Sequence, residues 1–311
     1  MSIIWTANYS YPDIPLDENF DHAELGMSIR QNGHSHLAVD LFKLRFNPNL
    51  NYHGTNVERP DMVFLRAMLI RDDIYRNFKF LENSGVVFLN DIDAQYHASN
   101  KITIFKNLQK NNIPIPKTIY IKIPFDETDI DQIDNEIGWP CVVKWMHGYA
   151  RLGVELCESP DDLYRIIKNR KAIANEHKIS EFKFDGLIIQ ELIRTKHVVQ
   201  IHGVGDVYHA VMQFTYKDYG FKSNLVKNAI TLPHKIDDEL RDISSRVLRS
   251  LKLDSARIEV LLTSDGYKVC EVNPQGSHGW VTMTHLKNIS DILVSHLCKK
   301  YDKIKSTNGN P

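Results

Sequence analysis

The segment 256–273, ARIEVLLTSDGYKVCEVN, is the feature that most restricts how this chain can fold. Two runs in which apolar and polar residues alternate flank a short loop, residues 264–266, that ends in glycine. A three-residue loop with glycine last is common in β-hairpins, because glycine readily adopts the left-handed conformation that the bulge position requires. The predicted register pairs Thr263 with Tyr267, Leu261 with Val269, and Glu259 with Glu271.

This register places the carboxylates of Glu259 and Glu271 directly opposite each other, with Cβ atoms ~5 Å apart. Like charges in that arrangement destabilise a sheet unless one is protonated, a basic residue intervenes or a cation binds. Arg257 lies on the same face and could neutralise the pair, and Asn273 follows on that face. Two carboxylates and an amide are also the oxygen ligands that Mg²⁺ prefers. The hairpin by itself leaves a structural salt bridge and a magnesium site open.

The rest of the chain mixes strand and helix patterns, which indicates an α/β or α+β fold. Segment 60–71 suggests a buried strand that runs into a helix, and the acidic segment 126–137 suggests a helix with a solvated face. Gly205 and Asp206 are typical of a two-residue hairpin turn. The other predicted strands cover 85–90, 117–123, 140–146, 186–193, 198–204 and 207–215. Of the other predicted helices, one starts at a Ser99 cap and one at a capping box over 159–162. Two more cover 237–251 and 290–301.

Two lysines lie where a bound anion would explain them. Lys144 lies within an apolar strand, PCVVKWM, and a buried ammonium group requires an anionic partner. A glycine-containing turn follows at residues 148–153, whose backbone amides could bind a polyphosphate, although the pattern is not a Walker A motif. A strand lysine that extends to the surface is an equally good interpretation. Lys101 lies in the first turn of its helix, where the helix dipole disfavours a cation unless an anion binds nearby.

The charge balance excludes general binding to polyanions. The 311 residues include 38 basic and 39 acidic side chains, so we expect no nucleic acid and no membrane partner. No apolar run approaches the roughly 20 residues that cross a bilayer, and we expect no signal peptide because the N-terminus lacks that pattern. The cysteines are far apart in sequence, which indicates reduced thiols in a cytoplasmic protein; they are Cys141, Cys157, Cys270 and Cys298.

Five segments in a fixed order carry a resemblance to a known family. They are Asn100-Lys101-Ile102 followed by IPIPKT (113–118), PCVVK (140–144) with the glycine loop, QELI (190–193), FKSN (221–224), and Glu259 followed twelve positions later by EVN (271–273). On these segments, the region from about residue 85 to the C-terminal helix resembles the ATP-grasp superfamily, and within it the RimK-like carboxylate–amine ligases.

The resemblance implies an ATP-grasp fold preceded by an N-terminal pre-ATP-grasp α/β domain. The domain would cover residues 1–96, the central lobe 97–185 and the C-terminal lobe 186–311. ATP would bind between the two lobes. We also expect a homo-oligomer, either a dimer or a tetramer.

The resemblance further implies roles for individual residues. Lys101, Lys144 and the loop glycines would contact the phosphates of ATP, and a hinge would hold the adenine. Carboxylates and an amide would bind Mg²⁺ or Mn²⁺. The γ-phosphoryl group would pass to a carboxylate, and an amine would attack the resulting acylphosphate, on an amino acid, peptide or protein substrate. The implied sets are Lys101, Lys144, Gly148, Gly153, Gln190, Glu191, Leu192 and Ile193 for ATP, and Glu259, Glu271 and Asn273 for the metal.

The chain departs from the family pattern near the expected acceptor. Gln200 stands where the family has an arginine, and Lys222 stands where a second arginine is usual, which loses the bidentate fork. Arg151 replaces a loop glycine and could supply the missing charge. We therefore expect Arg151, Lys222 and Asn224 to serve catalysis.

Other functions stay open. The loop 274–280, PQGSHGW, is closer to that of graspetide ligases, which crosslink peptides, and its His278 and Trp280 could contact the substrate or simply pack. A kinase acting on a small polyol phosphate would require a basic pocket, to which Arg66, Arg71 and Arg76 could contribute, although positions on a helix surface suit them better. A non-catalytic nucleotide-binding module would be expected to have lost the metal-binding residues, which are present here.

Overall fold

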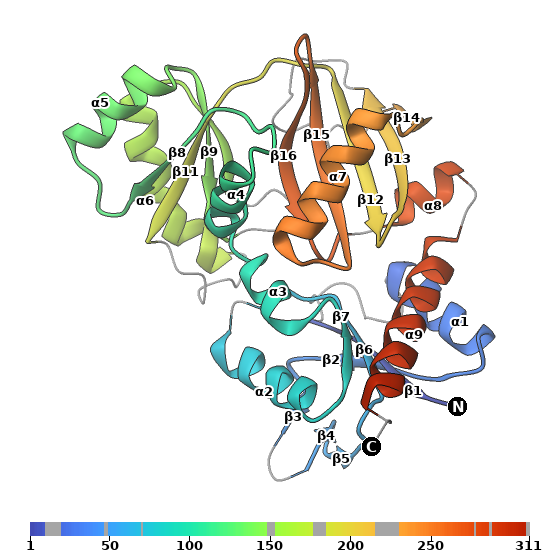
Figure 1. Ribbon diagram of the computed structural model, residues 1–311. Helices are drawn as coiled ribbons and strands as arrows, with labels where there is room; N and C mark the ends of the chain where they lie inside the picture. Colours follow the sequence, from blue (N-terminus) through green and yellow to red (C-terminus); the bar gives the residue numbers. More distant parts are fainter. Residues whose placement is uncertain are drawn as a thin grey trace.

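The computed structural model describes residues 1–9, 20–46, 49–69, 71–147, 153–176, 185–214, 230–276, 278–285 and 288–308. Three units are visible in Figure 1, with the N-terminal unit at the bottom and the other two side by side above it. Helices and strands are mixed along the chain, and the strands form several sheets, so the predicted α/β (α+β) class is confirmed. Within the described ranges, no helix is both long enough and apolar enough to cross a membrane.

The N-terminal unit is built on a parallel sheet whose strands lie in the order β2-β1-β6-β7. These strands cover Ile3–Asn8 (β1), Ser35–Asp40 (β2), Met62–Leu65 (β6) and Val87–Leu89 (β7). Parallel strands that are covered on both faces are apolar throughout, and every residue of β6 is buried. The unit also contains α1 (Phe20–Gln31), α2 (Asp72–Asn83), α3 (Ile92–His97) and a small sheet of β3 (Leu44–Arg45), β4 (Asn51–Tyr52) and β5 (Thr55–Asn56).

Two predicted strands are present in this unit with adjusted limits. The strand predicted within 60–71 is β6, but it does not run into a helix there, because α2 begins at Asp72. The strand predicted over 85–90 is β7.

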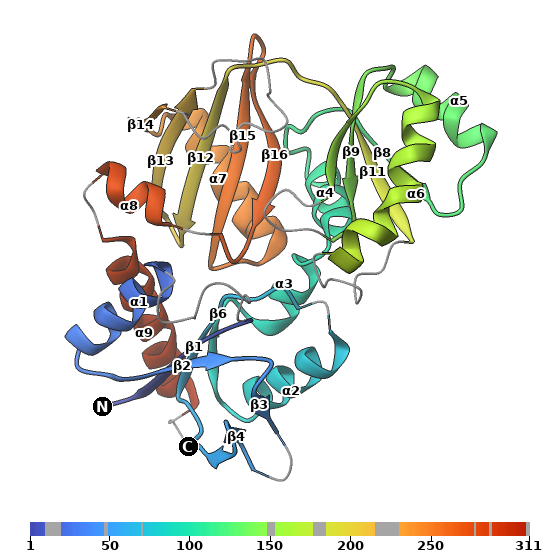
Figure 2. The ribbon, with the colours of Figure 1, turned by 180° about the vertical axis from the view of Figure 1, so that it is seen from behind.

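The last helix of the chain, α9 (Ile289–Asn308), packs against the N-terminal unit. Its Leu293 and Leu297 lie in one buried cluster with Ile4 and Phe64 of the parallel sheet. Both ribbon views show α9 beside α1 (Figures 1 and 2). A helix within segment 186–311 therefore contributes to the core formed by the first residues of the chain.

The middle unit has an antiparallel sheet in the order β10-β9-β11-β8. Its strands are β8 (Thr118–Lys122), β9 (Cys141–Trp145), β10 (Val154–Cys157) and β11 (Gly186–Glu191), and its helices are α4 (Lys101–Lys110), α5 (Glu127–Glu136) and α6 (Pro160–Glu176). The predicted cap of α4 is wrong by one residue, because the Asn100 side chain accepts the Thr103 N–H at 3.2 Å. Ser99 instead donates its hydroxyl to the Gln95 carbonyl.

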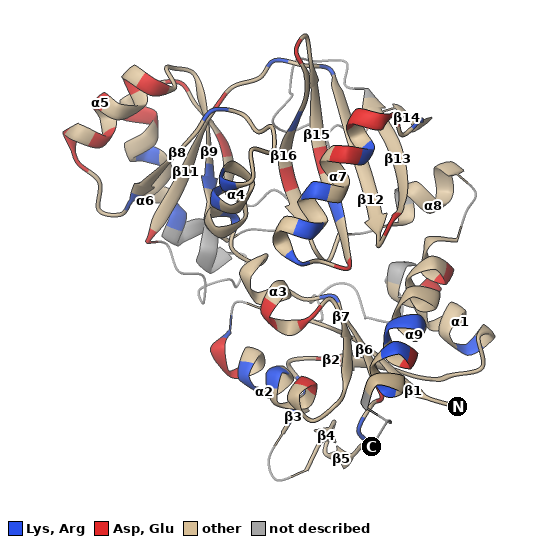
Figure 3. Cartoon of the chain, viewed as in Figure 1, with Lys and Arg blue, Asp and Glu red and all other residues tan. Residues whose placement is uncertain are grey.

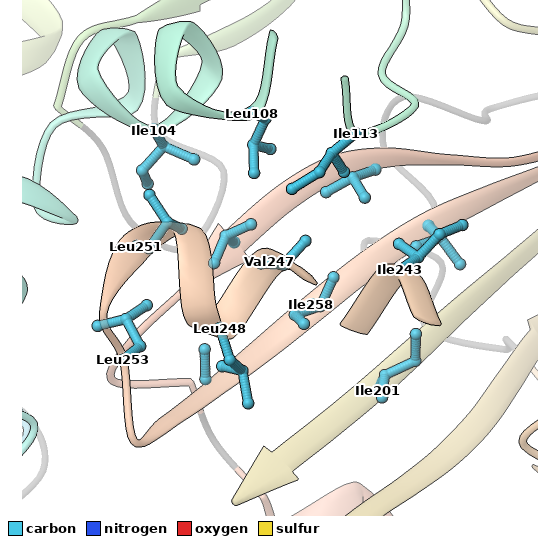
Figure 4. Packing of buried hydrophobic residues seen from close by; sticks show 14 of the residues in the cluster. Ile104, Leu108, Ile113, Ile201, Ile243, Val247, Leu248, Leu251, Leu253 and Ile258 are labelled. Carbon is cyan, nitrogen blue, oxygen red and sulfur yellow. The ribbon is translucent and has the colours of Figure 1, made fainter. Parts of the chain in front are cut away.

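The C-terminal unit has a five-stranded antiparallel sheet in the order β14-β13-β12-β15-β16. Figure 4 shows one face packed against α7, with Val247 close to Ile258 and with Leu251 close to Ile104 of α4. The predicted two-residue hairpin at Gly205 is confirmed, because Val204 pairs with Val207. The elements are β12 (His197–Val204), β13 (Val207–Phe214), β14 (Ile230–His234), α7 (Asp238–Leu251), β15 (Ser255–Thr263), β16 (Gly266–Asn273) and α8 (Gly279–His285).

The β15–β16 hairpin has the predicted carboxylate pair but a different turn. Thr263 pairs with Gly266 and Leu261 with Lys268, so the pairings of Thr263 with Tyr267 and Leu261 with Val269 are wrong. A register shift between Glu259 and Val260 leaves Cys270 unpaired and restores the pairing of Glu259 with Glu271. The bulge absorbs the one-residue difference between the shorter turn and the predicted one.

Candidate active site

Basic side chains from the middle unit meet acidic and carbonyl groups of the C-terminal unit beside β16. The Lys101 ammonium group lies 3.1 Å from Glu271 Oε1, and Lys144 Nζ donates to the Cys270 carbonyl at 2.7 Å. The Lys101 backbone N–H donates to the Met146 carbonyl at 2.8 Å, which ties the start of α4 to the end of β9. Figure 3 shows basic positions on α4 and β9 and acidic positions on β15 and β16. Three regions far apart in sequence, α4, β9 and the β15–β16 hairpin, thus form one polar site.

Lys144 is buried in β9 and does not extend to the surface. The residue is 8% exposed, and its ammonium group lies 5.3 Å from the centre of the Phe105 ring, within range of a cation–π contact. Burial lowers the pKa of Lys144, whereas the nearby Cys270 and Glu271 act in the opposite direction. The Cys270 carbonyl that accepts this hydrogen bond from Lys144 belongs to the bulge residue. The bulge therefore both restores the carboxylate pairing and presents an acceptor to Lys144.

The carboxylate pair is held by basic and amide groups on the same face. Arg257 Nη2 lies 3.2 Å from Glu259 Oε1, and the Gln200 side chain donates to the same oxygen at 3.3 Å. Burial alone would raise the pKa of Glu271, but the charges of Lys101, Arg257 and Lys144 outweigh it and hold that pKa at about 2. Glu271 is therefore a carboxylate at neutral pH.

The donor set at this hairpin fits a hard divalent cation. Glu259 and Glu271 provide two carboxylates, and Asn273, paired with Arg257 across the strands, provides an amide oxygen. In the described ranges, no three His, Cys, Asp or Glu side chains come together closely enough to hold a metal ion. Mg²⁺ in proteins commonly takes one or two carboxylates and completes its shell with water and substrate phosphates, which matches a site of this size. The salt bridge that the sequence allowed, between Arg257 and Glu259, is present as well.

The hinge residues lie where the middle sheet is connected to the C-terminal one. Gln190 is buried and donates to the Thr118 hydroxyl at 2.9 Å. The Glu191 carboxylate accepts the Lys117 N–H at 2.8 Å and the Lys268 ammonium group at 2.9 Å. Strand β11 ends at Glu191, so Leu192 and Ile193 belong to the connection to β12 and not to the strand that was predicted to reach residue 193. The Glu191 contacts join this connection to both sheets.

Gly153 is required by the backbone and by its neighbour. It adopts a φ of +74°, and a Cβ atom there would lie 2.3 Å from Cδ2 of Trp145. Gly148 and Arg151 belong to the part of the glycine loop that lies outside the described residues. Lys222 and Asn224, in a later segment, also lie outside them. Gly153 is thus the member of the predicted loop whose local role the structure defines.

Gly153→Ala is expected to lower the free energy of unfolding by about 2–4 kcal/mol, because left-handed strain and overlap with Trp145 add. Gly138→Ala is the matched control, since Gly138 has a φ of +81° and a Cβ atom added there would meet no described atom within 4 Å. It should cost roughly 1–2 kcal/mol from strain alone. Denaturant unfolding of both variants measures the difference, and equal losses would contradict the role assigned to Trp145.

The sequence patterns did not predict the place of two residues in the site, Arg257 and Arg66. Arg257 was expected only as a neutralising charge. Arg66 was expected to suit a helix surface, but it follows β6 and its guanidinium donates to the Gln275 carbonyl at 3.3 Å. The available signal was its place at the carboxyl end of a buried strand, where α/β folds collect ligand-facing residues.

His278 packs and does not face outward. It is fully buried, with Nε2 3.2 Å from the Glu24 carboxylate and 2.9 Å from the Ser290 hydroxyl. It thereby joins the segment after β16 to α1 and α9. The side chain of Trp280 lies outside the described residues.

Comparisons with known proteins give concordant results. The family model of the RimK-like ATP-grasp domain matches residues 98–297. A probable alpha-L-glutamate ligase of Pseudomonas putida (strain KT2440) is 26% identical over 280 residues, covering 86% of this chain and 88% of the relative. One from Pseudomonas fluorescens (strain SBW25) is 27% identical over 282 residues, with the same coverage.

Three solved structures are similar over nearly their whole length. The ATP-grasp ligase PsnB complexed with minimal precursor has a TM-score of 0.66 at 17% identity, covering 96% of this chain and 99% of that one. The D-alanine–D-alanine ligase of Bacillus anthracis complexed with ATP has a TM-score of 0.68 at 13% identity, covering 99% and 100%. The macrocyclase MdnC of Microcystis aeruginosa, bound with precursor peptide MdnA, has a TM-score of 0.66 at 16% identity, covering 96% and 99%.

Proposed function

The chain belongs to the RimK-like ATP-grasp family, and we propose that it uses the site beside β16 to activate a carboxylate with ATP and join it to an amine. The expected ATP-grasp fold is confirmed, and the protein is an ADP-forming carboxylate–amine ligase of this class. One observation carries the assignment of the site: Lys101 and Lys144 of one unit meet the Glu271 segment of the other.

ATP would bind between these two units. The ammonium groups of Lys101 and Lys144 would contact the phosphates of ATP. The phosphates would then compete with Glu271 for Lys101 and with the Cys270 carbonyl for Lys144. Gly153 would shape the loop that covers the phosphates. The connection at residues 190–193 would hold the adenine, and the Glu191 side chain is occupied by contacts with Lys117 and Lys268.

Glu259, Glu271 and Asn273 would hold Mg²⁺, and Mn²⁺ could replace it because both accept oxygen ligands. Bound there, the ion would neutralise charge on the phosphates during transfer. The chain itself supplies Arg257, whose guanidinium lies beside Glu259 on the face that carries Gln200. Arg257 would provide the positive charge that the family pattern places at position 200. Arg151, Lys222 and Asn224 stay predicted catalytic residues.

The reaction requires no covalent bond to the protein. A substrate carboxylate oxygen would attack the γ-phosphorus, the bond to the β-phosphate oxygen would break, and ADP would leave. An amine would then attack the acylphosphate carbon, phosphate would depart, and the nitrogen would lose a proton as the amide forms. The site would act by positioning the reactants and by placing Lys101, Lys144 and Arg257 around the developing negative charge.

The substrate we favour is an amino acid such as glutamate, added to an amino acid, peptide or protein. The support is that the Pseudomonas relatives named alpha-L-glutamate ligase align over most of both chains. Peptide crosslinking stays the alternative, because PsnB and MdnC are similar in fold and bind precursor peptides. We also propose a cytoplasmic location and a homo-oligomer.

ADP release, screened over amino acids, peptides and polyol phosphates with mass spectrometry of the products, tests the function. A ligase gives a product equal to the sum of two substrates less one water. A macrocyclase gives one peptide that has lost water, and a kinase gives a product that has gained phosphate. ADP formation with neither the joined product nor the dehydrated peptide would contradict the proposal.

A further inference from the structure

Side chains of the N-terminal unit contact the backbone carbonyls of the loop that follows β16, residues 274–276. Arg66 Nη2 donates to the Gln275 carbonyl at 3.3 Å and approaches the Gly276 carbonyl at 3.5 Å. Asn90 Nδ2 approaches the Pro274 carbonyl at 3.4 Å. All three carbonyls of the loop therefore face donors that lie about 200 residues earlier in the chain.

The other side of the same loop contacts the proposed catalytic centre. The Gln275 N–H donates to Asn273 Oδ1 at 3.0 Å, and the Gly276 N–H donates to the Asn273 carbonyl at 3.2 Å. A Cβ atom on Gly276 would lie 2.3 Å from Cβ of Arg257, so the loop backbone lies against the stem of that arginine. The loop thus fixes both an oxygen proposed as a metal ligand and a proposed catalytic cation.

We propose that Arg66 is a positioning residue that sets the metal affinity of the site through the loop 274–276. This inference rests on the proposed function. The Gln275 carbonyl held by Arg66 shares its peptide plane with the Gly276 N–H, which donates to the Asn273 carbonyl. Arg66 thereby holds the loop against Asn273, and the Gln275 N–H of the same loop donates to the Asn273 side-chain oxygen. Groups that orient metal ligands in this way typically contribute 10–100-fold to metal affinity or activity.

Arg66, which also lies 3.5 Å from His278 Nδ1, is one of several contacts between the two units. The docking depends on Asn90, whose side chain pairs with both backbone groups of Ser255, at 2.7 Å and 3.0 Å. It also depends on Lys300, which donates to the Phe88 carbonyl at 3.0 Å and to Asp254 at 2.6 Å. Replacing Arg66 leaves these contacts in place, so its effect on the site can be measured in a docked protein.

The test compares Arg66→Gln and Arg66→Lys with Arg45→Gln. Arg45 is the matched control, because it also donates to two backbone carbonyls of the N-terminal unit, those of Phe42 and Leu44, but does so outside the site. Calorimetry measures ADP binding with and without Mg²⁺, and steady-state kinetics gives kcat, the KM for ATP and the Mg²⁺ concentration at half activity.

Arg66→Gln should weaken Mg²⁺-dependent ADP binding and lower kcat by about 10–100-fold, with metal-free ADP binding nearly unchanged. Arg66→Lys should recover part of the loss, and Arg45→Gln should match the wild type. Unchanged Mg²⁺ dependence in a folded Arg66→Gln protein, or equal losses in both glutamine variants, would overturn the inference.

A second variant keeps the test decisive if Arg66→Gln does not fold. Gln275→Ala removes the side-chain bond from Gln275 Nε2 to the Ala67 carbonyl, 3.2 Å long, and should shift Mg²⁺ dependence in the same direction by a smaller factor. An unshifted Mg²⁺ dependence in Gln275→Ala would contradict the loop's role. Absence of any Mg²⁺-dependent ADP binding in the wild type would instead refute the proposed function.

Discussion

Glu271→Gln is expected to abolish ATP turnover, lowering kcat by about 1,000-fold, or ~4 kcal/mol, because it removes the charge of a proposed metal ligand. Glutamine has nearly the same shape and retains an oxygen for the contact with Lys101. Neighbouring cations hold the Glu271 pKa at about 2, and the pair with Lys101 is only partly exposed, so loss of the charge should also lower the free energy of unfolding, by about 1–3 kcal/mol. Rates of ADP release and thermal unfolding measure the two effects.

The control for this variant is Glu239→Gln. Glu239 also reaches β16, where its carboxylate accepts the Tyr267 N–H at 3.2 Å, but it lies at the turn end of the hairpin. It should leave turnover unchanged. If Glu271→Gln retained wild-type turnover, or if both variants lost it equally, the metal assignment would be refuted.

Lys144→Met is expected to weaken the affinity for a non-hydrolysable ATP analogue by about 100-fold, or ~2.7 kcal/mol, which is the scale of a charge-assisted hydrogen bond to phosphate. Methionine should fill the apolar space beside Phe105, so the fold should be retained. Removing a buried charge also spares its cost of desolvation. Isothermal calorimetry measures the affinity directly.

Lys106→Met provides the matched control for Lys144. Lys106 also lies over an aromatic ring, with its ammonium group 5.0 Å from the centre of Tyr120, but this residue is exposed on α4 whereas Lys144 is buried. Its replacement should not change nucleotide affinity. An unchanged affinity in Lys144→Met would mean that this lysine serves the Cys270 carbonyl alone and contacts no phosphate.

The hairpin could be predicted because its information is local. Alternation, a glycine and a short loop fixed the two strands, and the carboxylate pairing followed from them. The turn was predicted one residue too long, and the bulge at Cys270 compensated for it. Nothing in the alternation marks a bulge, because an unpaired residue changes the pairing without changing the residue types.

The N-terminal unit was the least predictable part. Strand β1 lies in the interior of the parallel sheet, and β2, at its edge, is packed against α1. Strands covered in this way carry little alternation to mark them. The helix α9, which packs against the sheet that contains β1, is also distant from β1 in sequence. A single sequence holds no local pattern for a contact between the first and last helices.

The site shows the same division. Lys144 could be selected because a charge within an apolar strand is unusual, and its burial agrees with that argument. Arg66 follows a buried strand, which marks it only weakly, because the loop that it contacts lies 209 positions away. Asn100 was passed over as a cap in favour of Ser99, since both are good capping residues and propensity does not separate neighbours.

The central claim is that ATP activates a substrate carboxylate as an acylphosphate. Labelling that carboxylate with heavy oxygen tests it most directly, using the substrate that supports ADP release and its amine partner. The account predicts that the inorganic phosphate formed carries one labelled oxygen and that the amide product retains the other. Phosphate free of label, formed at the rate of ADP release, would contradict the account.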